Sequence, residues 1–292
     1  MSHGSSTIKV GFLGGGKMAK AIAAAIVRAG MCSASDINMS SRTEDSMKAI
    51  AALGYKAGTN TEARLCSLIQ LIRLIGTVTE RTHGGILFVT VKPAGALAVL
   101  EEVRNSLSCV AVLVSACVGV PLAELCNAAP GIPVARIMPN VLCAVGEGAT
   151  GFCMNSCNED AKALLLRVLK AFGPVHAISE DLFDAYSAIS GSSPAFVCTF
   201  IEAMIDGGVK CGLPRQLATE AALQSVRGTA ILAQTSGVHP ALIRDDITSP
   251  GGTTIAGVLA MERRALRAAG RHPFQTARAF YPPYSEIPTL WD

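Results

Sequence analysis

The pattern of apolar and polar positions changes near residue 176. Before that point, short apolar runs of strand length each end at a turn, and stretches of helical length separate them; the runs are Ile8–Leu13, Asp36–Ser41, Ile86–Val91, Val110–Ser115 and Val134–Met138. Strands that alternate with helices predict a parallel sheet with helices on both faces, the doubly wound α/β class of Rossmann-type folds. We therefore expect residues 8–175 to form one such domain.

The second part of the chain shows helical spacing without the alternation of a strand. Leu182–Gly207 is one predicted helix, and a second opens at Pro214 and reaches about Thr235, where Ser236-Gly237 ends it. Small residues recur along these segments and permit close approach of helices. Residues 176–269 are therefore predicted to form an all-α domain that is shared between subunits.

A glycine-rich turn follows the first predicted strand and opens the first predicted helix. It reads Gly14-Gly15-Gly16-Lys17-Met18-Ala19, a G-x-G-x-x-A pattern in which Ala19 is small enough for close packing of helix on strand. Glycines let a diphosphate approach backbone N–H groups at a helix start. The predicted cofactor-binding residues here are Gly14, Gly16, Lys17, Met18 and Ala19, and the alternative is a structural turn.

The end of the second predicted strand bears on the choice of dinucleotide. NAD-binding folds usually carry an acidic residue there for the ribose 2′-hydroxyl, but here Ser41 and Arg42 occupy that end and Asp36 lies at the beginning. Hydroxyl and guanidinium groups suit a 2′-phosphate. NADP(H) is therefore favoured over NAD(H), with a solvated loop arginine as the alternative.

Three later strands end in turns that we expect at the same edge of the sheet, because ligands of doubly wound folds bind beyond the carboxyl ends of the strands. The predicted cofactor-binding residues in these turns are Val91, Lys92, Pro93, Ala116, Cys117, Gly119 and Asn140. Lys92 is the most distinctive of them, although many lysines after strands are only solvated.

Ser249-Pro250-Gly251-Gly252-Thr253-Thr254 precedes a helical run and is the strongest candidate for chemistry in the second part. Two glycines free the backbone, and two threonines place hydroxyls beside the unpaired N–H groups of a helix start. Such a site suits a small carboxylate. The alternative is an ordinary capped helix start.

Composition narrows the class of protein. The 292 residues are 50% hydrophobic and 16% charged, with a net charge of +3 and mean hydropathy of +0.41, which excludes disorder and offers no basic surface for nucleic acid. The longest uncharged run, Asn105–Ala123, contains Gly119 and Pro121 and predicts a buried strand, not a membrane helix. Residues 1–7 are polar and are predicted to be a disordered tail without a secretory signal.

The ten cysteines form no CxxC and no Cys/His pairing at zinc spacing, so we expect no metal. Most of them lie in apolar surroundings, where a thiol acts as a small hydrophobe. We expect reduced thiols and a cytoplasmic location, with the mitochondrial matrix as the alternative.

Taken together, these motifs resemble the pyrroline-5-carboxylate reductase family. Six segments carry the resemblance in the family's order: Gly11–Ala19, Val91-Lys92-Pro93, Met138-Pro139-Asn140, Ser190-Gly191-Ser192-Ser193-Pro194-Ala195, Asp206–Gly212 and Ser249–Thr254. The resemblance covers Ile8 to about Ala269. It implies hydride transfer from NAD(P)H to the C=N carbon of 1-pyrroline-5-carboxylate, which gives L-proline.

The resemblance also implies roles for residues. Gly14–Ala19 would hold the diphosphate, Ser41 and Arg42 would flank the adenosine ribose, Asn60 and Val91–Pro93 would contact the rest of the cofactor, and Ala116–Gly119 would lie near the nicotinamide. The substrate residues would be Glu180, Asp246, Ser249, Gly251, Gly252, Thr253 and Thr254, with Thr254 and Lys92 as catalytic candidates. Helical domains would interleave in a homodimer, and dimers would assemble into a decamer.

The residues are compatible with an imine substrate, which arrives protonated and needs orientation more than a dedicated acid. None of the five histidines sits in a motif for an acid. Two other functions stay open: reduction of another cyclic imino acid, and a catalytically impaired nucleotide-binding protein on the same scaffold.

Five features depart from the family pattern. Cys117 adds bulk to the turn expected near the nicotinamide, Ser193 replaces a usual glycine, and Arg263-Arg264 replaces two small residues. The segment near 61–85 makes the spacing from Asn60 to Val91 about twice that of the family. Three interpretations are open: a tolerated loop, an altered splice product, or damage to the sheet. Residues 270–292 form an atypical tail rich in proline and aromatic residues, and its prolines predict that no helix continues there.

Overall fold

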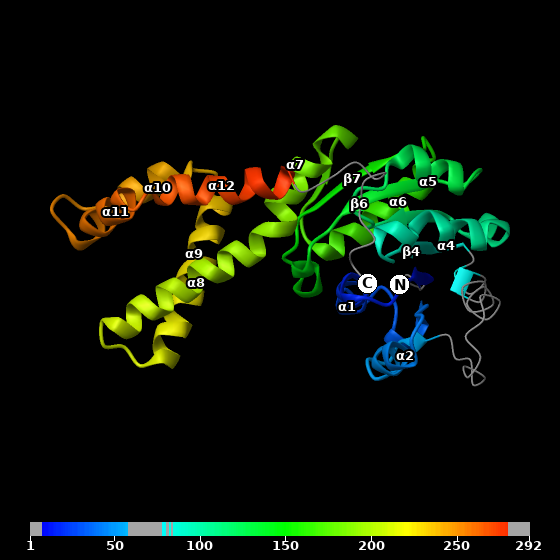
Figure 1. Ribbon diagram of the computed structural model, residues 1–292, viewed down its shortest axis with the longest axis horizontal. Helices are drawn as coiled ribbons and strands as arrows, with labels where there is room; N and C mark the ends of the chain where they lie inside the picture. Colours follow the sequence, from blue (N-terminus) through cyan, green and yellow to red (C-terminus); the bar gives the residue numbers. More distant parts are fainter. Residues whose placement is uncertain (1–7, 58–77, 80–81, 83, 280–292) are drawn as a thin grey trace, which may run out of the picture. The chain divides into compact units, whose positions relative to one another are not determined.

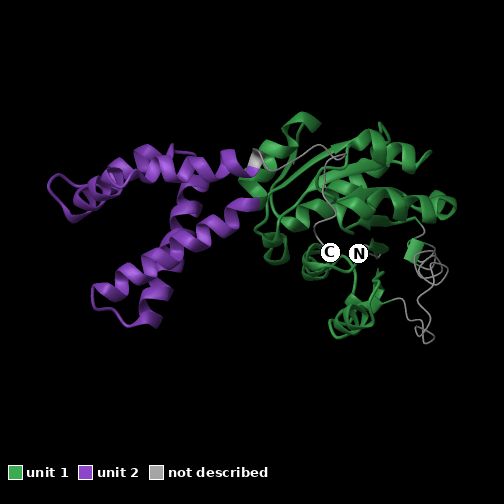
Figure 2. Cartoon of the chain, viewed as in Figure 1, with its two compact units in different colours: residues 1–191, 279–292 green, residues 192–278 purple. Residues whose placement is uncertain are grey.

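The computed structural model describes residues 8–57, 78–79, 82 and 84–279. Asn60, residues 1–7, most of the segment near 61–85 and the end of the tail lie outside the described residues, and so do the predictions made for them. The chain divides into two compact units, with Ser192–Arg278 as the second (Figure 2).

An eight-stranded, mostly parallel sheet forms the centre of the first unit (Figure 1). Its strands are β1 (Val10–Leu13), β2 (Ile37–Met39), β3 (Lys56–Ala57), β4 (Ile86–Val89), β5 (Val112–Ser115), β6 (Val134–Met138), β7 (Thr150–Met154) and β8 (Val175–Ala177). They lie in the order β3-β2-β1-β4-β5-β6-β7-β8, and β6 and β7 form the antiparallel pair. The predicted doubly wound class is confirmed.

Helices cover both faces of this sheet because its strands are apolar on both sides. They are α1 (Lys17–Arg28), α2 (Glu44–Ala51), α4 (Ala96–Val103), α5 (Leu122–Ala128), α6 (Glu159–Leu169) and α7 (Phe183–Ser187). Phe12 packs in the cluster that holds α1 and α6, whereas its neighbour Leu13 packs in the cluster that holds α4 and α5. Phe12 and Phe88 stack at 5.0 Å between ring centroids, which joins β1 to β4.

The sheet is continuous beyond the unusual segment. β4 pairs in parallel register with β1 on one side and with β5 on the other. The strand that follows the segment is therefore intact, so the interpretation of the segment as damage to the sheet does not hold at β4.

The second unit is entirely helical. Its helices are α8 (Ser193–Lys210), α9 (Arg215–Ser236), α10 (Pro240–Ile247), α11 (Thr253–Arg263) and α12 (Leu266–Ala279). α8 and α9 pack side by side (Figure 1), and a Cβ at Gly208 would lie 3.2 Å from the Ala218 side chain, so small residues do bring these helices close. Gly237, at φ 64°, ends α9 as predicted.

Large apolar side chains stay exposed on these helices within one chain, among them Val197, Phe200, Leu217, Ile231, Leu232 and Leu259. The helical run Glu180–Lys210 is also long and apolar enough to cross a membrane by length and composition, and 11% of its most apolar window is buried. One such helix is weak evidence for a membrane span, because helices that pack against other protein pass the same test.

Two predicted boundaries differ from the structure. The first unit extends to Gly191 and not to residue 175, because β8 joins the sheet and α7 contacts β6. The helix predicted to fail in the tail instead continues as α12 with Pro273 inside it. Pro273 removes one backbone N–H, but its neighbour Phe274 packs edge-on against Phe196 of α8 at 5.3 Å, and this contact supports the helix.

Candidate active site

Gly14 begins the predicted cofactor turn directly after β1, and two constraints require glycine there. Its φ of 104° is one that other residues rarely adopt, and a Cβ would lie 2.9 Å from the Thr90 carbonyl carbon. The Gly14 N–H donates to Ser40 Oγ at 3.0 Å. The turn is therefore held close to the ends of both β2 and β4.

The start of α1 offers backbone N–H groups to an anion. Gly16 is the extended N-cap and has open space where a Cβ would stand, and the first turn contains no acidic residue. Lys17 is exposed, while Ala19 is buried against the core, as its small size predicted. The positive end of the helix dipole and these N–H groups together suit a phosphate.

The turn lies at the switch point of the sheet. β1 pairs with β2 on one side and with β4 on the other, so the chain reverses its direction of winding across β1. Ligands of doubly wound folds bind at this crevice. Ser41 and Arg42 follow β2 at the same edge, Ser41 half-buried and Arg42 exposed.

The turns after β4 and β5 are joined to each other. The Ala116 N–H donates to the Val89 carbonyl at 3.0 Å, and the Cys117 thiol lies 3.5 Å from the Val89 carbonyl and 3.3 Å from the Val91 carbonyl. Lys92 is exposed and Pro93 half-buried. The structure therefore brings Val91–Pro93 and Ala116–Gly119 together at the carboxyl edge.

The prediction that the Cys117 side chain adds bulk near the nicotinamide is wrong. Its side chain is 3% exposed and belongs to the core cluster beneath the sheet, and burial raises the pKa of this thiol to about 12. A thiol is small and apolar enough to pack among core residues. Only the backbone of this residue stands at the edge.

Asn140 follows β6, but its side-chain amide serves the fold. It is 5% exposed, donates to the Ser190 carbonyl at 2.7 Å and accepts from the Leu142 N–H at 3.0 Å. These bonds tie the turn after β6 to the π-helical turn Ala188–Ser192. This predicted cofactor residue therefore lies at the carboxyl edge of the sheet, and its amide is already engaged in hydrogen bonds within the fold.

Glu180, a predicted substrate residue, is likewise engaged. Its Oε1 accepts from Arg136 Nη1 at 2.7 Å and from the Leu122 N–H at 2.6 Å. Arg136 is buried and stacks over the Phe183 ring at 4.6 Å. Sequence reasoning missed Arg136, because a single arginine inside an apolar strand belongs to no motif.

In the helical unit, the predicted carboxylate loop leads into α11. Gly251 has a φ of 69°, Gly252 is the extended N-cap, and a Cβ at Gly252 would collide with Ser249 Oγ. Thr253 and Thr254 are exposed in the first turn, which contains no acidic residue. The loop is therefore a second glycine-led helix start that suits an anion.

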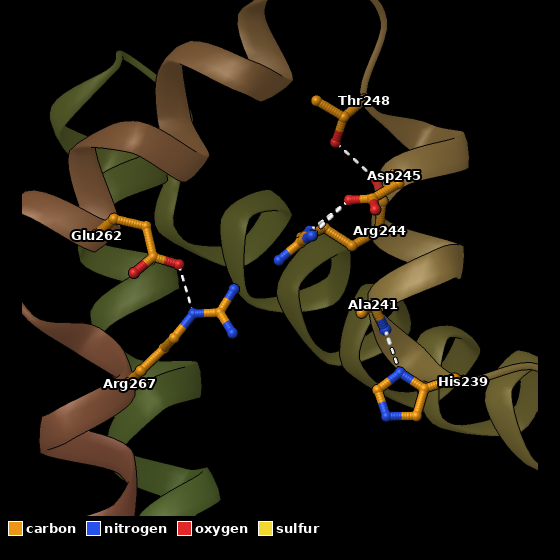
Figure 3. Close-up of polar contacts among 7 residues, drawn as sticks. All are labelled: His239, Ala241, Arg244, Asp245, Thr248, Glu262 and Arg267. Atoms are coloured by element: carbon orange, nitrogen blue, oxygen red, sulfur yellow. Dashed lines mark hydrogen bonds and ion pairs between the residues drawn. The ribbon is translucent and has the colours of Figure 1, made fainter.

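The polar groups around this loop fix its flanks (Figure 3). Arg244 Nε donates to Asp245 at 2.8 Å, Thr248 donates to the Arg244 carbonyl at 2.6 Å, and the His239 ring accepts from the Ala241 N–H at 3.2 Å. The last bond makes His239 a helix cap. Asp246 is exposed.

Across the loop, Arg267 Nε donates to Glu262 at 2.6 Å (Figure 3), and this bond raises the pKa of Arg267. Among the residues that the structure describes, no three His, Cys, Asp or Glu side chains gather as a metal-binding group.

Family models match both parts of the chain. The model described as pyrroline-5-carboxylate reductase dimerisation matches residues 180–279. The model described as NADP oxidoreductase, coenzyme F420-dependent, matches residues 9–119.

Named relatives extend over nearly the whole chain. Pyrroline-5-carboxylate reductase of Methanosarcina acetivorans is 35% identical over 89% of this chain and 92% of its own length, and pyrroline-5-carboxylate reductase 3 of Rattus norvegicus is 36% identical over 92% and 93%. The Plasmodium falciparum pyrroline carboxylate reductase, solved with NADP bound, has a TM-score of 0.79 and 27% identity over 96% of this chain and 99% of that one. By its sequence and its fold, this chain belongs to the pyrroline-5-carboxylate reductase family.

Proposed function

We propose that this protein is an NAD(P)H-dependent oxidoreductase that reduces 1-pyrroline-5-carboxylate to L-proline, the last step of proline biosynthesis. The observation that carries the proposal is the pair of glycine-led helix starts, one after Gly14–Gly16 and one after Gly251-Gly252, each without an acidic residue in its first turn. The reaction needs two anions held: the diphosphate of the cofactor and the carboxylate of the substrate.

When bound, NAD(P)H would supply a hydride to the C=N carbon, and the electron pair of the C=N bond would pass to the ring nitrogen. The chain's own residues bind and orient. The N–H groups of α1 hold the diphosphate, and those of Ser249–Thr254 hold the substrate carboxylate. The Thr254 hydroxyl orients the ring nitrogen, and Lys92 supplies positive charge at the edge of the sheet.

The pyrrolinium nitrogen enters protonated, so hydride addition leaves a neutral amine that solvent protonates afterwards. This chemistry needs no side chain with a strongly perturbed pKa at the site. The role proposed for the chain is therefore binding and orientation of cofactor and substrate, not acid catalysis.

The choice of cofactor rests on the end of β2. Ser41 and Arg42 offer a hydroxyl and a guanidinium to a 2′-phosphate, with no acidic residue between them and β2, so NADPH is the preferred cofactor and NADH a weaker one. Arg42→Ala should lower kcat/KM for NADPH more than for NADH. An equal effect on both cofactors contradicts the assignment.

The protein is a homo-oligomer, since the matched dimerisation family covers the helical unit. The apolar side chains exposed on α8, α9 and α11 would be buried against a second copy. We further propose that five dimers assemble into a decamer. Sedimentation equilibrium distinguishes a dimer from a decamer directly.

The assay that tests the function measures substrate-dependent oxidation of NADPH and NADH by the folded recombinant protein. Activity with pyrroline-5-carboxylate is expected to exceed activity with the six-membered homologue. NADPH binding without turnover of either ring would show a nucleotide-binding protein instead. Subcellular fractionation tests the proposed cytoplasmic location against the mitochondrial matrix.

A further inference from the structure

Two side-chain hydroxyls from neighbouring strand ends hold the peptide groups of Gly14. Ser40 Oγ, at the end of β2, accepts from the Gly14 N–H at 3.0 Å. The Thr90 hydroxyl, at the end of β4, lies 2.9 Å from the Gly14 carbonyl and 3.2 Å from the Leu13 carbonyl. Neither residue is among those assigned to the cofactor above.

The Thr90 backbone already continues the ladder between β1 and β4. Its N–H donates to the Leu13 carbonyl at 2.8 Å, which leaves the hydroxyl available to the next carbonyl along, that of Gly14. The two backbones approach closely here, since a Cβ at Gly14 would lie 2.9 Å from both the carbonyl carbon and the oxygen of Thr90. The hydroxyl thus fixes a peptide that glycine leaves free to rotate.

Holding this carbonyl has a consequence for the next residue. In a planar trans peptide the C=O of Gly14 and the N–H of Gly15 point in opposite directions. A carbonyl held toward β4 therefore aims the Gly15 N–H away from β4. If the carbonyl rotated, the carbonyl oxygen would approach the diphosphate and repel it.

We propose that Thr90 is a positioning residue for the cofactor, whose hydroxyl holds the Gly14 carbonyl so that the Gly15 N–H faces the diphosphate. The inference rests on the proposed function for the identity of the ligand. Thr90 also precedes Val91-Lys92-Pro93, so the same hydroxyl ties the glycine turn to the turn that carries Lys92.

The test compares matched threonine substitutions. Thr90→Val keeps the shape and removes the hydroxyl, Thr90→Ser restores the hydroxyl, and Thr90→Ala removes it without a branched side chain in case the valine variant does not fold. Thr150→Val is the control, because Thr150 is buried in β7 of the same sheet and its hydroxyl has no hydrogen-bond partner among the described residues.

Equilibrium binding of NADPH, followed by nicotinamide fluorescence, is measured together with kcat and both KM values. Thr90→Val and Thr90→Ala should raise Kd and KM for NADPH by about tenfold, with kcat and KM for pyrroline-5-carboxylate unchanged. Thr90→Ser and Thr150→Val should bind NADPH like the parent. The proposal is overturned if the hydroxyl-free variants bind NADPH as the parent does, or if serine fails to restore binding.

Binding is scored without substrate, so this inference can fail separately from the proposed function. A parent protein that binds NADPH but reduces no imine refutes the function and still allows the Thr90 comparison. A parent protein that binds no NADPH refutes both.

Discussion

Removal of the Glu180 carboxylate should destabilise the first unit and leave substrate binding intact. Glu180 Oε1 accepts two hydrogen bonds, from Arg136 at 2.7 Å and from the Leu122 N–H at 2.6 Å. The Arg136 side chain is 6% exposed and that of Glu180 is 37% exposed. Glu180→Ala therefore leaves a buried guanidinium without its counter-charge.

Breaking a fully buried pair costs about 3–5 kcal/mol, and hydrogen bonds to charged groups contribute about 1.5–3 kcal/mol each. Because water reaches one side of Glu180 and the Phe183 ring lies 4.6 Å from the guanidinium, we expect about 2–3 kcal/mol for Glu180→Ala. Glu180→Gln keeps an oxygen that accepts both bonds and should cost about 1 kcal/mol.

Urea unfolding at one fixed protein concentration measures these losses. The matched control is Glu101→Ala, which breaks an ion pair with Arg104. The Arg104 side chain is 43% exposed and that of Glu101 is 63% exposed, so this substitution should cost less than about 0.5 kcal/mol. The double variant Arg136→Met with Glu180→Ala should be more stable than Glu180→Ala alone, since it removes the unpaired charge.

Two outcomes would refute this reasoning. One is a double variant no more stable than the single one, which would show that the unpaired charge is not the cause. The other is an intact Glu180→Ala protein with a raised KM for pyrroline-5-carboxylate, which would make Glu180 a substrate ligand, as the family resemblance implies.

Three further predictions concern other parts of the chain. Ala265 has a φ of 55°, a left-handed conformation that costs a residue other than glycine about 1–2 kcal/mol. Ala265→Gly removes this strain but adds roughly 0.4–1 kcal/mol of entropy to the unfolded chain. The strain is the larger of the two, so Tm should rise, and a lower Tm contradicts this. Burial raises the pKa of the Cys117 thiol from 9.0 to about 12, so above pH 9 the unfolded chain loses a proton that the folded one keeps. The free energy of unfolding should therefore fall above pH 9 by about 1.4 kcal/mol per pH unit on account of this thiol. Cys117→Ala should reduce the slope of unfolding free energy against pH, whereas replacement of the exposed Cys157 should leave that slope unchanged. Thr150→Val should equal or exceed the parent in urea unfolding, because the Thr150 hydroxyl is buried without a partner among the described residues; a clear loss would reveal a bond to that hydroxyl.

The sequence predicted the sheet well because its strands depend on local patterns. Apolar runs marked β1, β4, β5 and β6 to within a few residues, and each was followed by recognisable turn chemistry. The beginning of the tail, as far as Ala279, was predicted wrongly, because Pro273 breaks a local rule while Phe274 contacts Phe196, far away in the sequence. Local propensity was outweighed by packing that no local pattern reveals.

The same distinction applies to the candidate site residues. An anion site built from backbone N–H groups needs glycines and a helix start, and these are adjacent in sequence, so Gly14–Gly16 and Gly251-Gly252 could both be proposed as such sites from the sequence. The groups that hold such a backbone in place come from elsewhere: Ser40 is 26 residues from Gly14, and Thr90 is 76. A hydroxyl at such a separation looks like any solvated serine or threonine until the fold brings it to the turn. Positioning residues of a Rossmann-type site should therefore be sought among the small polar side chains at the carboxyl ends of the strands flanking β1, where the sheet register places them against the glycine turn.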